Sequence, residues 1–213
     1  MSGRPAFDLG LYLVIGSQDV APGRLEATLR AALAGGVTLV QLREKQADGE
    51  TAVALGKRMK DILDPLGVPL IVNDDVAAAK ALGAGVHLGQ DDLPAAEARA
   101  ALGADAIIGV SAGTPEEARR VDRSLVDYLG IGPVFATATK SDAGAAIGPE
   151  GIRRVLEIAP LPAVAIGGIS AKNAGDCVRG GAEGVAVVSA ICGAADPEAA
   201  ARELRAAVEA ARR

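Results

Sequence analysis

The chain has 213 residues, of which 50% are hydrophobic but only 2% are aromatic, and it contains no tryptophan. This length suits one α/β domain with a large core, and a core of Val, Ile, Leu and Ala suits parallel strands covered on both faces. The formal net charge of −5 argues against a strongly basic surface, so we expect neither nucleic acid nor a membrane as partner.

Short runs rich in Val, Ile and Leu alternate with Ala-, Glu- and Arg-rich segments of helical periodicity. The predicted strands are residues 10–15, 38–44, 69–74, 85–89, 106–111, 127–132, 163–168 and 184–190. The predicted helices are residues 22–35, 49–65, 75–83, 94–102, 115–124, 149–159, 171–180 and 196–211. Helix starts are marked by Thr114-Pro115 and Asp196-Pro197.

Strand–helix alternation with short connections predicts parallel strands and right-handed crossovers. No Gly/Ser linker interrupts the units, and the turn after the first strand, IGSQDVAPG, lacks the glycine pattern of a dinucleotide site. We therefore predict a single (β/α)8 TIM barrel of the α/β class over residues 1–213, rather than an open doubly wound sheet.

The sequence also indicates where the protein works. Its amino terminus lacks the basic-then-apolar pattern of a signal peptide, and its longest uncharged apolar stretch, residues 184–195, is shorter than the roughly 20 residues of a membrane helix. Cys177 and Cys192 show no metal-ligand spacing and predict reduced, unreactive thiols. We expect a cytoplasmic protein.

Polar groups follow nearly every predicted strand, at the rim where TIM barrels hold their active sites. A helix cap or a rim ion pair would explain any one of them equally well, as at Asp75. A whole ring of them instead indicates a charged ligand, because desolvating charged groups is costly. The strand-end segments that make up this ring are Gln41 to Lys45, Asn73 to Asp75, Gly89 to Asp92, Ser111, Thr137 to Lys140, Gly167 to Gly168 and Val188 to Ser189.

The residue types in this ring point to diphosphate chemistry. Asp74 and Asp92 follow neighbouring strands and could share one Mg²⁺, which takes few carboxylates and leaves other positions to water and phosphate. The alternative is two helix-capping acids. Arg43, Lys45 and Lys140 supply positive charge for a diphosphate.

A second anion site is predicted near Gly168 and Ser189, because the loops after strands 7 and 8 of barrels commonly hold phosphate. The segment 131–141, IGPVFATATKS, adds hydroxyls and an ammonium, although by itself it could equally be a Thr-rich surface turn. Two phosphate sites imply two phosphorylated substrates, or one long one.

Seven motifs in order across residues 10–192 make the chain resemble the thiamine phosphate synthase family: QLREK at 41–45, VND at 72–74, GVHLGQDD at 85–92, GVS at 109–111, GPVFATATK at 132–140, AIGGI at 165–169 and GVAVVSAI at 184–191. The resemblance implies an enzyme that joins hydroxymethylpyrimidine diphosphate to the ring nitrogen of a thiazole phosphate and releases pyrophosphate. Mg²⁺ is the implied cofactor.

The resemblance also implies a role for each matching residue. Asp74 and Asp92 would bind Mg²⁺. The pyrimidine diphosphate would contact Gln41, Leu42, Arg43, Glu44, Lys45, Asn73, Ser111 and Lys140. The thiazole phosphate would contact Thr137, Ala138, Thr139, Gly168, Val188 and Ser189. We expect Arg43, Lys45, Ser111 and Lys140 to be the catalytic residues.

This chemistry needs stabilisation of a departing diphosphate rather than a nucleophilic side chain. The only histidine, His87, is therefore interpreted as a structural or supporting residue, because alternation along a barrel strand can point it away from the rim. A displacement in which the diphosphate leaves before the thiazole nitrogen attacks is the expected mechanism.

Two other functions are considered. A thiazole tautomerase of the same fold is disfavoured because Gly113 stands where many relatives have histidine. A non-catalytic sensor of phosphorylated ligands is disfavoured by the presence of Asp74, Asp92, Arg43 and Lys140. The expected partners are small phosphorylated substrates, and apolar helix faces would also suit a homo-oligomer.

Overall fold

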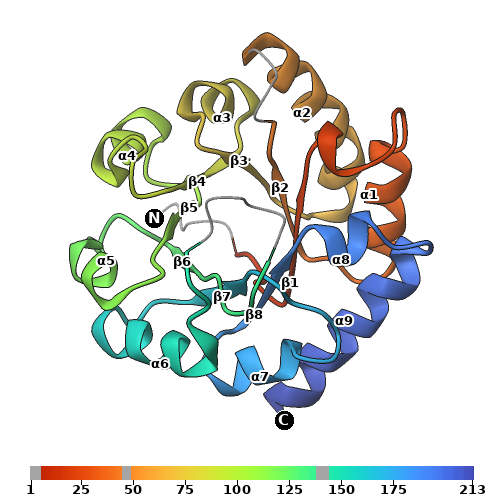
Figure 1. Cartoon of the computed structure of the whole chain (residues 1–213). Coiled ribbons are helices and arrows are strands. Elements are labelled where there is room, and N and C mark those ends of the chain that lie inside the picture. Colours follow the sequence, from red (N-terminus) through yellow and green to blue (C-terminus); the bar gives the residue numbers. More distant parts are fainter. Residues whose placement is uncertain (1–5, 45–48, 138–143) are drawn as a thin grey trace.

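The computed structural model describes residues 6–44, 49–137 and 144–213. Its strands form a closed parallel barrel in chain order, with helices packed around the outside (Figure 1). The predicted (β/α)8 TIM barrel is confirmed. The strands are β1 Leu11–Ile15, β2 Leu39–Leu42, β3 Leu70–Asn73, β4 Gly85–Leu88, β5 Ile108–Ser111, β6 Tyr128–Ile131, β7 Ala163–Ile166 and β8 Gly184–Val187.

Each predicted helix is present, with ends that differ from the predicted ones by at most four residues. The helices are α1 Leu25–Ala34, α2 Gly49–Leu63, α3 Val76–Leu82, α4 Ala95–Leu102, α5 Pro115–Arg120, α6 Gly148–Ile158, α7 Ala174–Arg179, α8 Ser189–Cys192 and α9 Pro197–Arg212, with 3-10 turns at Ser17–Asp19 and Asp64–Leu66. No helix among the described residues combines the length and apolarity needed to cross a membrane.

The eighth strand shows the clearest difference from prediction. The strand predicted over residues 184–190 ends at Val187, and α8 begins at Ser189. Val188 breaks the extended backbone, with φ −114° and ψ −83°. Its apolar, β-branched neighbours resemble a strand in sequence, so periodicity alone did not reveal the turn.

Helix starts follow the predicted capping residues. The Thr114 side chain accepts from the Glu117 backbone N–H, and Glu117 reaches back to the backbone of Thr114, which makes a capping box. The Asp196 side chain accepts from Ala199 N at 3.0 Å. Both predicted helix starts are confirmed.

Alternation along the strands divides the apolar residues between two cores. One core lies between the barrel and the helices and includes Leu13 and Leu42. The other fills the barrel interior, where Tyr12 of β1 and Tyr128 of β6 meet across the barrel. Its buried members are Leu9, Tyr12, Val14, Leu39, Ile71, Ile107, Tyr128, Val164 and Ala186.

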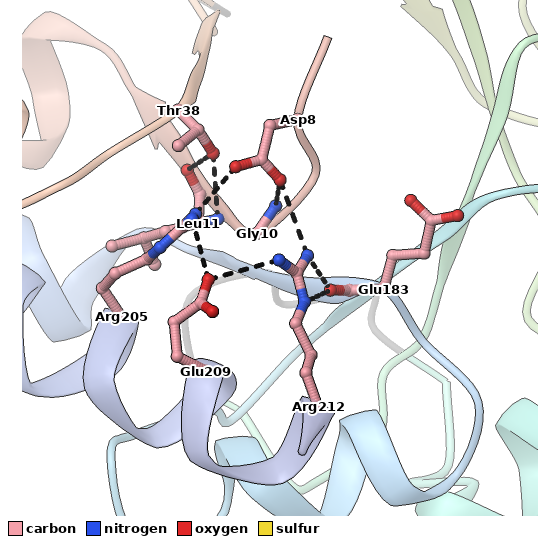
Figure 2. A network of polar contacts seen from close by, with 8 residues as sticks. All are labelled: Asp8, Gly10, Leu11, Thr38, Glu183, Arg205, Glu209 and Arg212. Carbon is pink, nitrogen blue, oxygen red and sulfur yellow. Dashed lines mark hydrogen bonds and ion pairs between the residues drawn. The ribbon is translucent and has the colours of Figure 1, made fainter.

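The amino end of the barrel carries a network of ion pairs that joins the segment before β1 to α9 (Figure 2). Arg205 lies 2.9 Å from Asp8 and 2.8 Å from Glu209, and Arg212 also pairs with both acids. Arg212 Nε donates to the Glu183 carbonyl at 2.8 Å. The network thereby fastens the last helix to the start of β1 and to the turn before β8.

Candidate active site

The predicted site residues of β2 to β5 lie at one rim. Neighbouring parallel strands place Gln41 beside Ile71, Asn73 beside His87, and Leu88 beside Val110, directly before Ser111. These residues stand at or next to the carboxyl ends of their strands, so the structure brings this part of the ring together. The predicted residues Lys45, Ala138, Thr139 and Lys140 lie outside the described residues.

Asp74 and Asp92 both lie around the end of β4. The backbone N–H of Asp74 donates to the His87 carbonyl at 2.9 Å, and Asp92 Oδ2 accepts from Gly89 N at 2.6 Å. Asp74 has a left-handed backbone, with φ 65°, a conformation that Asp tolerates better than most residues. The Asn73 side-chain amide donates to Asp74 and holds its carboxylate.

The capping alternative for these two acids is wrong. The residue that caps α3 is Asp75, whose side chain accepts from Ala78 N at 2.8 Å. Helix α4 is preceded by Pro94 and has no side-chain cap. Neither Asp74 nor Asp92 therefore serves as the N-cap of the helix that follows it.

The donor set around β4 suits a loosely held hard cation. The described residues contain no group of three or more His, Cys, Asp or Glu that could enclose a metal. Two carboxylates at an open rim fit Mg²⁺, which keeps several waters and accepts ligand phosphates, but would not satisfy a closed zinc site. Asp74 and Asp92 are the residues that would hold it.

The exit of β2 presents a cation and anchors the first loop. The Arg43 carbonyl accepts from Gln18 Nε2 at 2.7 Å. Burial raises the pKa of Asp19, and the positive charge of the Arg43 guanidinium acts in the opposite direction. The Glu44 carboxylate accepts from Ser17 N at 2.5 Å and Ser17 Oγ at 2.8 Å. Arg43 thus places a positive charge at this strand end, whereas Glu44 holds the β1 loop.

Leu42, the last residue of β2, is 1% exposed and packs in the core between barrel and helices. Its side chain therefore lies away from the barrel interior. A substrate contact at this position would involve the backbone.

A chain of hydrogen bonds crosses the barrel interior from β2 to β5. Gln41 Nε2 donates to the Tyr12 hydroxyl at 2.8 Å, and the Tyr12 and Tyr128 hydroxyls are 2.9 Å apart. His87 Nδ1 lies 3.0 Å from the Tyr128 hydroxyl, and its Nε2 lies 3.0 Å from Ser111 Oγ. The last side chain in this hydrogen-bond network, Ser111, is one of the predicted catalytic residues.

Burial in the barrel interior keeps the ionisable side chains of this hydrogen-bond network uncharged. Burial lowers the pKa of His87 to about 4, although the nearby Asp92 acts in the opposite direction. Burial also raises the pKa of Tyr128 well above its ordinary value. His87 is therefore a neutral imidazole at physiological pH, which agrees with a supporting role rather than that of a general base.

Sequence reasoning missed the two tyrosines. They are the only ones in a chain that is poor in aromatic residues, and both fall within predicted strands. A buried tyrosine hydroxyl usually has a hydrogen-bond partner. Two tyrosines within predicted strands could therefore have indicated a polar contact inside the barrel.

The second predicted anion site lies after β7 and β8. Gly167 and Gly168 have φ values of 99° and 64°. A Cβ on Gly168 would meet the Ala136 carbonyl oxygen at 2.4 Å, so glycine is required for packing against the β6 exit. Ser189 is the first residue of α8, and the Gly168 carbonyl accepts from Asn173 Nδ2 at 3.0 Å.

Gly113, which departs from the expected family pattern, also has a packing reason. A Cβ there would lie 2.5 Å from the Gly132 carbonyl oxygen. The Gly113 N–H donates to Glu117 Oε2 at 2.6 Å. A histidine at this position would require the exit of β6 to move.

A closed barrel with polar side chains gathered at the carboxyl rim defines a TIM-barrel enzyme. Residues 11–191 match the model of the thiamine monophosphate synthase family. The chain belongs to this family, and it is a transferase.

Curated proteins named thiamine-phosphate synthase are similar to this chain over nearly its whole length. The protein from Xanthobacter autotrophicus is 54% identical, with 97% of this chain and 98% of the relative covered. That from Moorella thermoacetica is 47% identical, with 98% and 99% covered.

Solved structures agree with this family assignment. Thiamine phosphate pyrophosphorylase from Pyrococcus furiosus has a TM-score of 0.85 and 37% identity, with 95% of this chain and 96% of that chain covered. A 3-hexulose-6-phosphate synthase, at 19% identity and a TM-score of 0.68 with 93% and 99% covered, shares the fold.

Proposed function

We propose that this protein is a thiamine phosphate synthase that joins hydroxymethylpyrimidine diphosphate to the ring nitrogen of a thiazole phosphate. Family membership over nearly the whole described barrel supports the reaction class. The observation that supports the site is the arrangement of Asp74, Asp92 and Ser111 around β4, with Arg43 directly after the end of β2.

In the proposed reaction, the bond between the pyrimidine methylene carbon and the diphosphate oxygen breaks, and its electron pair leaves with the diphosphate. The thiazole nitrogen then donates its lone pair to the methylene carbon. Arg43 is assigned to the departing charge, together with Lys45 and Lys140 as the sequence predicts. No protein nucleophile is needed, and neutral His87 agrees with that requirement.

Mg²⁺ held by Asp74 and Asp92 would stabilise negative charge on the diphosphate. Asn73 holds the Asp74 carboxylate and so supports this part of the site. The pyrimidine diphosphate would then lie along the ends of β2 to β5. Of the residues there, Gln41 is buried and Ser111 is partly buried.

We assign the thiazole phosphate to the loops after β6, β7 and β8. Thr137, Gly168, Val188 and Ser189 would contribute, together with the predicted Ala138 and Thr139. The two glycines after β7 have left-handed backbone conformations, and successive main-chain N–H groups in such turns commonly bind phosphate.

The test is release of pyrophosphate by the purified protein, with thiamine phosphate identified by mass spectrometry. We expect both products only when the pyrimidine diphosphate, the thiazole phosphate and Mg²⁺ are present together. Pyrophosphate release that does not need the thiazole phosphate, without coupled product, would contradict the proposed function.

The division of the pocket has its own test. Ser189→Asp should raise the KM for the thiazole phosphate, because it adds negative charge to that phosphate site, and should leave the KM for the pyrimidine diphosphate nearly unchanged. Ala195→Asp adds the same charge to an exposed position in the connection to α9 and is the matched control. Equal effects on both substrates would show that the division is wrong.

A further inference from the structure

The hydrogen-bond chain inside the barrel is a built feature of this sequence. A Cβ on Gly109 of β5 would lie 2.1 Å from Tyr128 Cζ, and a Cβ on Gly130 of β6 would lie 2.8 Å from His87 Cε1. Two strand glycines thus provide the space that the two rings occupy. Glycine weakens a strand, so its presence at both positions is explained by this close approach.

Each hydrogen bond of this network is donated in the direction from Gln41 towards Ser111. The Gln41 side chain donates to the Tyr12 hydroxyl, so the hydrogen of Tyr12 is left for its other partner, the Tyr128 hydroxyl. Tyr128 then receives one hydrogen and must donate its own.

His87 continues the same direction. His87 Nδ1 lies 3.0 Å from the Tyr128 hydroxyl and is the acceptor for the hydrogen that Tyr128 has left to donate. A neutral imidazole whose Nδ1 accepts a hydrogen bond carries its one hydrogen on the other nitrogen, Nε2. Nε2 therefore donates to Ser111 Oγ. The serine accepts this bond and keeps its own hydrogen for another acceptor.

We propose that Tyr12, Tyr128 and His87 are positioning residues that fix the Nε2–H tautomer of His87 and thereby make Ser111 a hydrogen-bond donor to an anionic ligand. With the opposite polarity, Ser111 would donate to His87 and turn its lone pairs towards the ligand, which would repel a phosphate oxygen. The identity of that ligand, the departing diphosphate, rests on the proposed function.

The tautomer can be observed directly because the chain contains a single histidine. The experiment records two-bond ¹H–¹⁵N correlations of the untagged protein labelled with ¹⁵N-histidine, without ligand and at neutral pH. We expect a protonated Nε2 and an unprotonated Nδ1. A protonated Nδ1, or averaged signals from rapid tautomer exchange, would overturn the proposal.

Tyr128→Phe removes the donor to Nδ1 and should release the tautomer. We expect Nδ1–H to appear in its spectrum and kcat to fall roughly tenfold, the loss typical of one hydrogen bond to a charged group. The KM for the thiazole phosphate should stay unchanged. A Tyr128→Phe spectrum identical to that of the wild type would contradict the proposal that Tyr128 fixes the tautomer of His87.

A double-mutant cycle separates positioning from a general structural effect. In a Ser111→Ala background, Tyr128→Phe should lower kcat by less than about twofold, because its effect acts through the serine hydroxyl. An equally large loss in both backgrounds would refute that route. The wild-type spectrum requires no turnover, so an inactive protein would refute the proposed function while leaving the tautomer to be decided by the spectrum.

Discussion

The two ends of the barrel use charged and polar side chains in different ways. At the amino end, Asp8, Arg205, Glu209 and Arg212 satisfy one another and tie α9 to the start of β1 (Figure 2). At the carboxyl end, Asp74 and Asp92 lie around the end of β4, and Arg43 follows the end of β2.

The difference separates stability from function. Groups that pair within the protein stabilise the fold by themselves, whereas a cluster of charged residues at the mouth of a barrel is typical of a site that binds a charged ligand. The amino end also contains a buried pair, Arg99 and Asp127, 2.8 Å apart. We therefore expect changes at the amino end to alter unfolding and changes at the carboxyl end to alter catalysis.

The largest expected effect is on activity, at the proposed metal ligands. Asp74→Asn and Asp92→Asn should each lower kcat/KM by roughly 100-fold or more, because a neutral amide binds Mg²⁺ more weakly than a carboxylate does. Both variants should require more Mg²⁺. Steady-state kinetics over a Mg²⁺ titration checks this, together with urea unfolding to show that the fold is retained.

Asp75→Asn and Asp91→Asn are the matched controls. Asp75 caps α3, and asparagine caps about as well as aspartate, so the helix is preserved. Equal losses of activity in these controls, or full wild-type activity in excess chelator, would contradict the metal assignment.

At the amino end, the largest expected effect is on stability. Asp127→Ala should lower the free energy of unfolding by about 3 kcal/mol or more, because it leaves the Arg99 guanidinium buried without its carboxylate. Asp127 also accepts from Ile108 N at 2.8 Å, at the start of β5. Urea unfolding measures the loss.

The kcat of folded Asp127→Ala should remain close to that of the wild type. The control is Asp122→Ala, an exposed acid nearby that hydrogen-bonds Ser124. This variant should leave the free energy of unfolding close to that of the wild type. A large fall in kcat for folded Asp127→Ala would mean that the two ends are not separable.

The barrel interior should show a pH-dependent stability. The pKa of His87 in the folded chain is about 4, below its ordinary value of 6.5, because of burial. Between these values the unfolded chain binds more protons than the folded one, so stability falls as pH falls through that window.

The difference between wild type and His87→Gln isolates this contribution from the carboxylates that titrate nearby, Asp92 among them. The wild type should lose on the order of 1–3 kcal/mol more than the variant between about pH 6.5 and 4. Chemical denaturation across the window provides the measurement. Parallel stability curves for the two proteins would contradict a low histidine pKa.

The smallest expected effect concerns the network of Figure 2. Arg205→Ala should cost about 1 kcal/mol, because its pairs with Asp8 and Glu209 are only partly buried. Arg153→Ala removes a well-exposed pair with Glu150 and should change stability by less than about 0.5 kcal/mol. Thermal unfolding at low and high salt distinguishes them, and a loss at Arg205 no larger than at Arg153 would show that the network does not fasten α9.

Much of this protein is determined by its sequence alone. Periodicity and helix caps predicted the barrel and its order of elements, because each βα unit carries its own local signals. Parallel strands bring their carboxyl ends to one rim, so the gathering of Asn73, Asp74 and Ser111 also followed from chain order.

Only the tertiary structure decided how side chains from distant strands meet. Tyr12 and Tyr128 are 116 positions apart, and their contact depends on barrel closure and on the side of the strand that each occupies. The direction of the hydrogen bonds from Gln41 to Ser111 likewise exists only once those five side chains share one interior. Strand patterns record which residues are buried, but the partner that each buried polar group finds is set by the packing of the whole barrel.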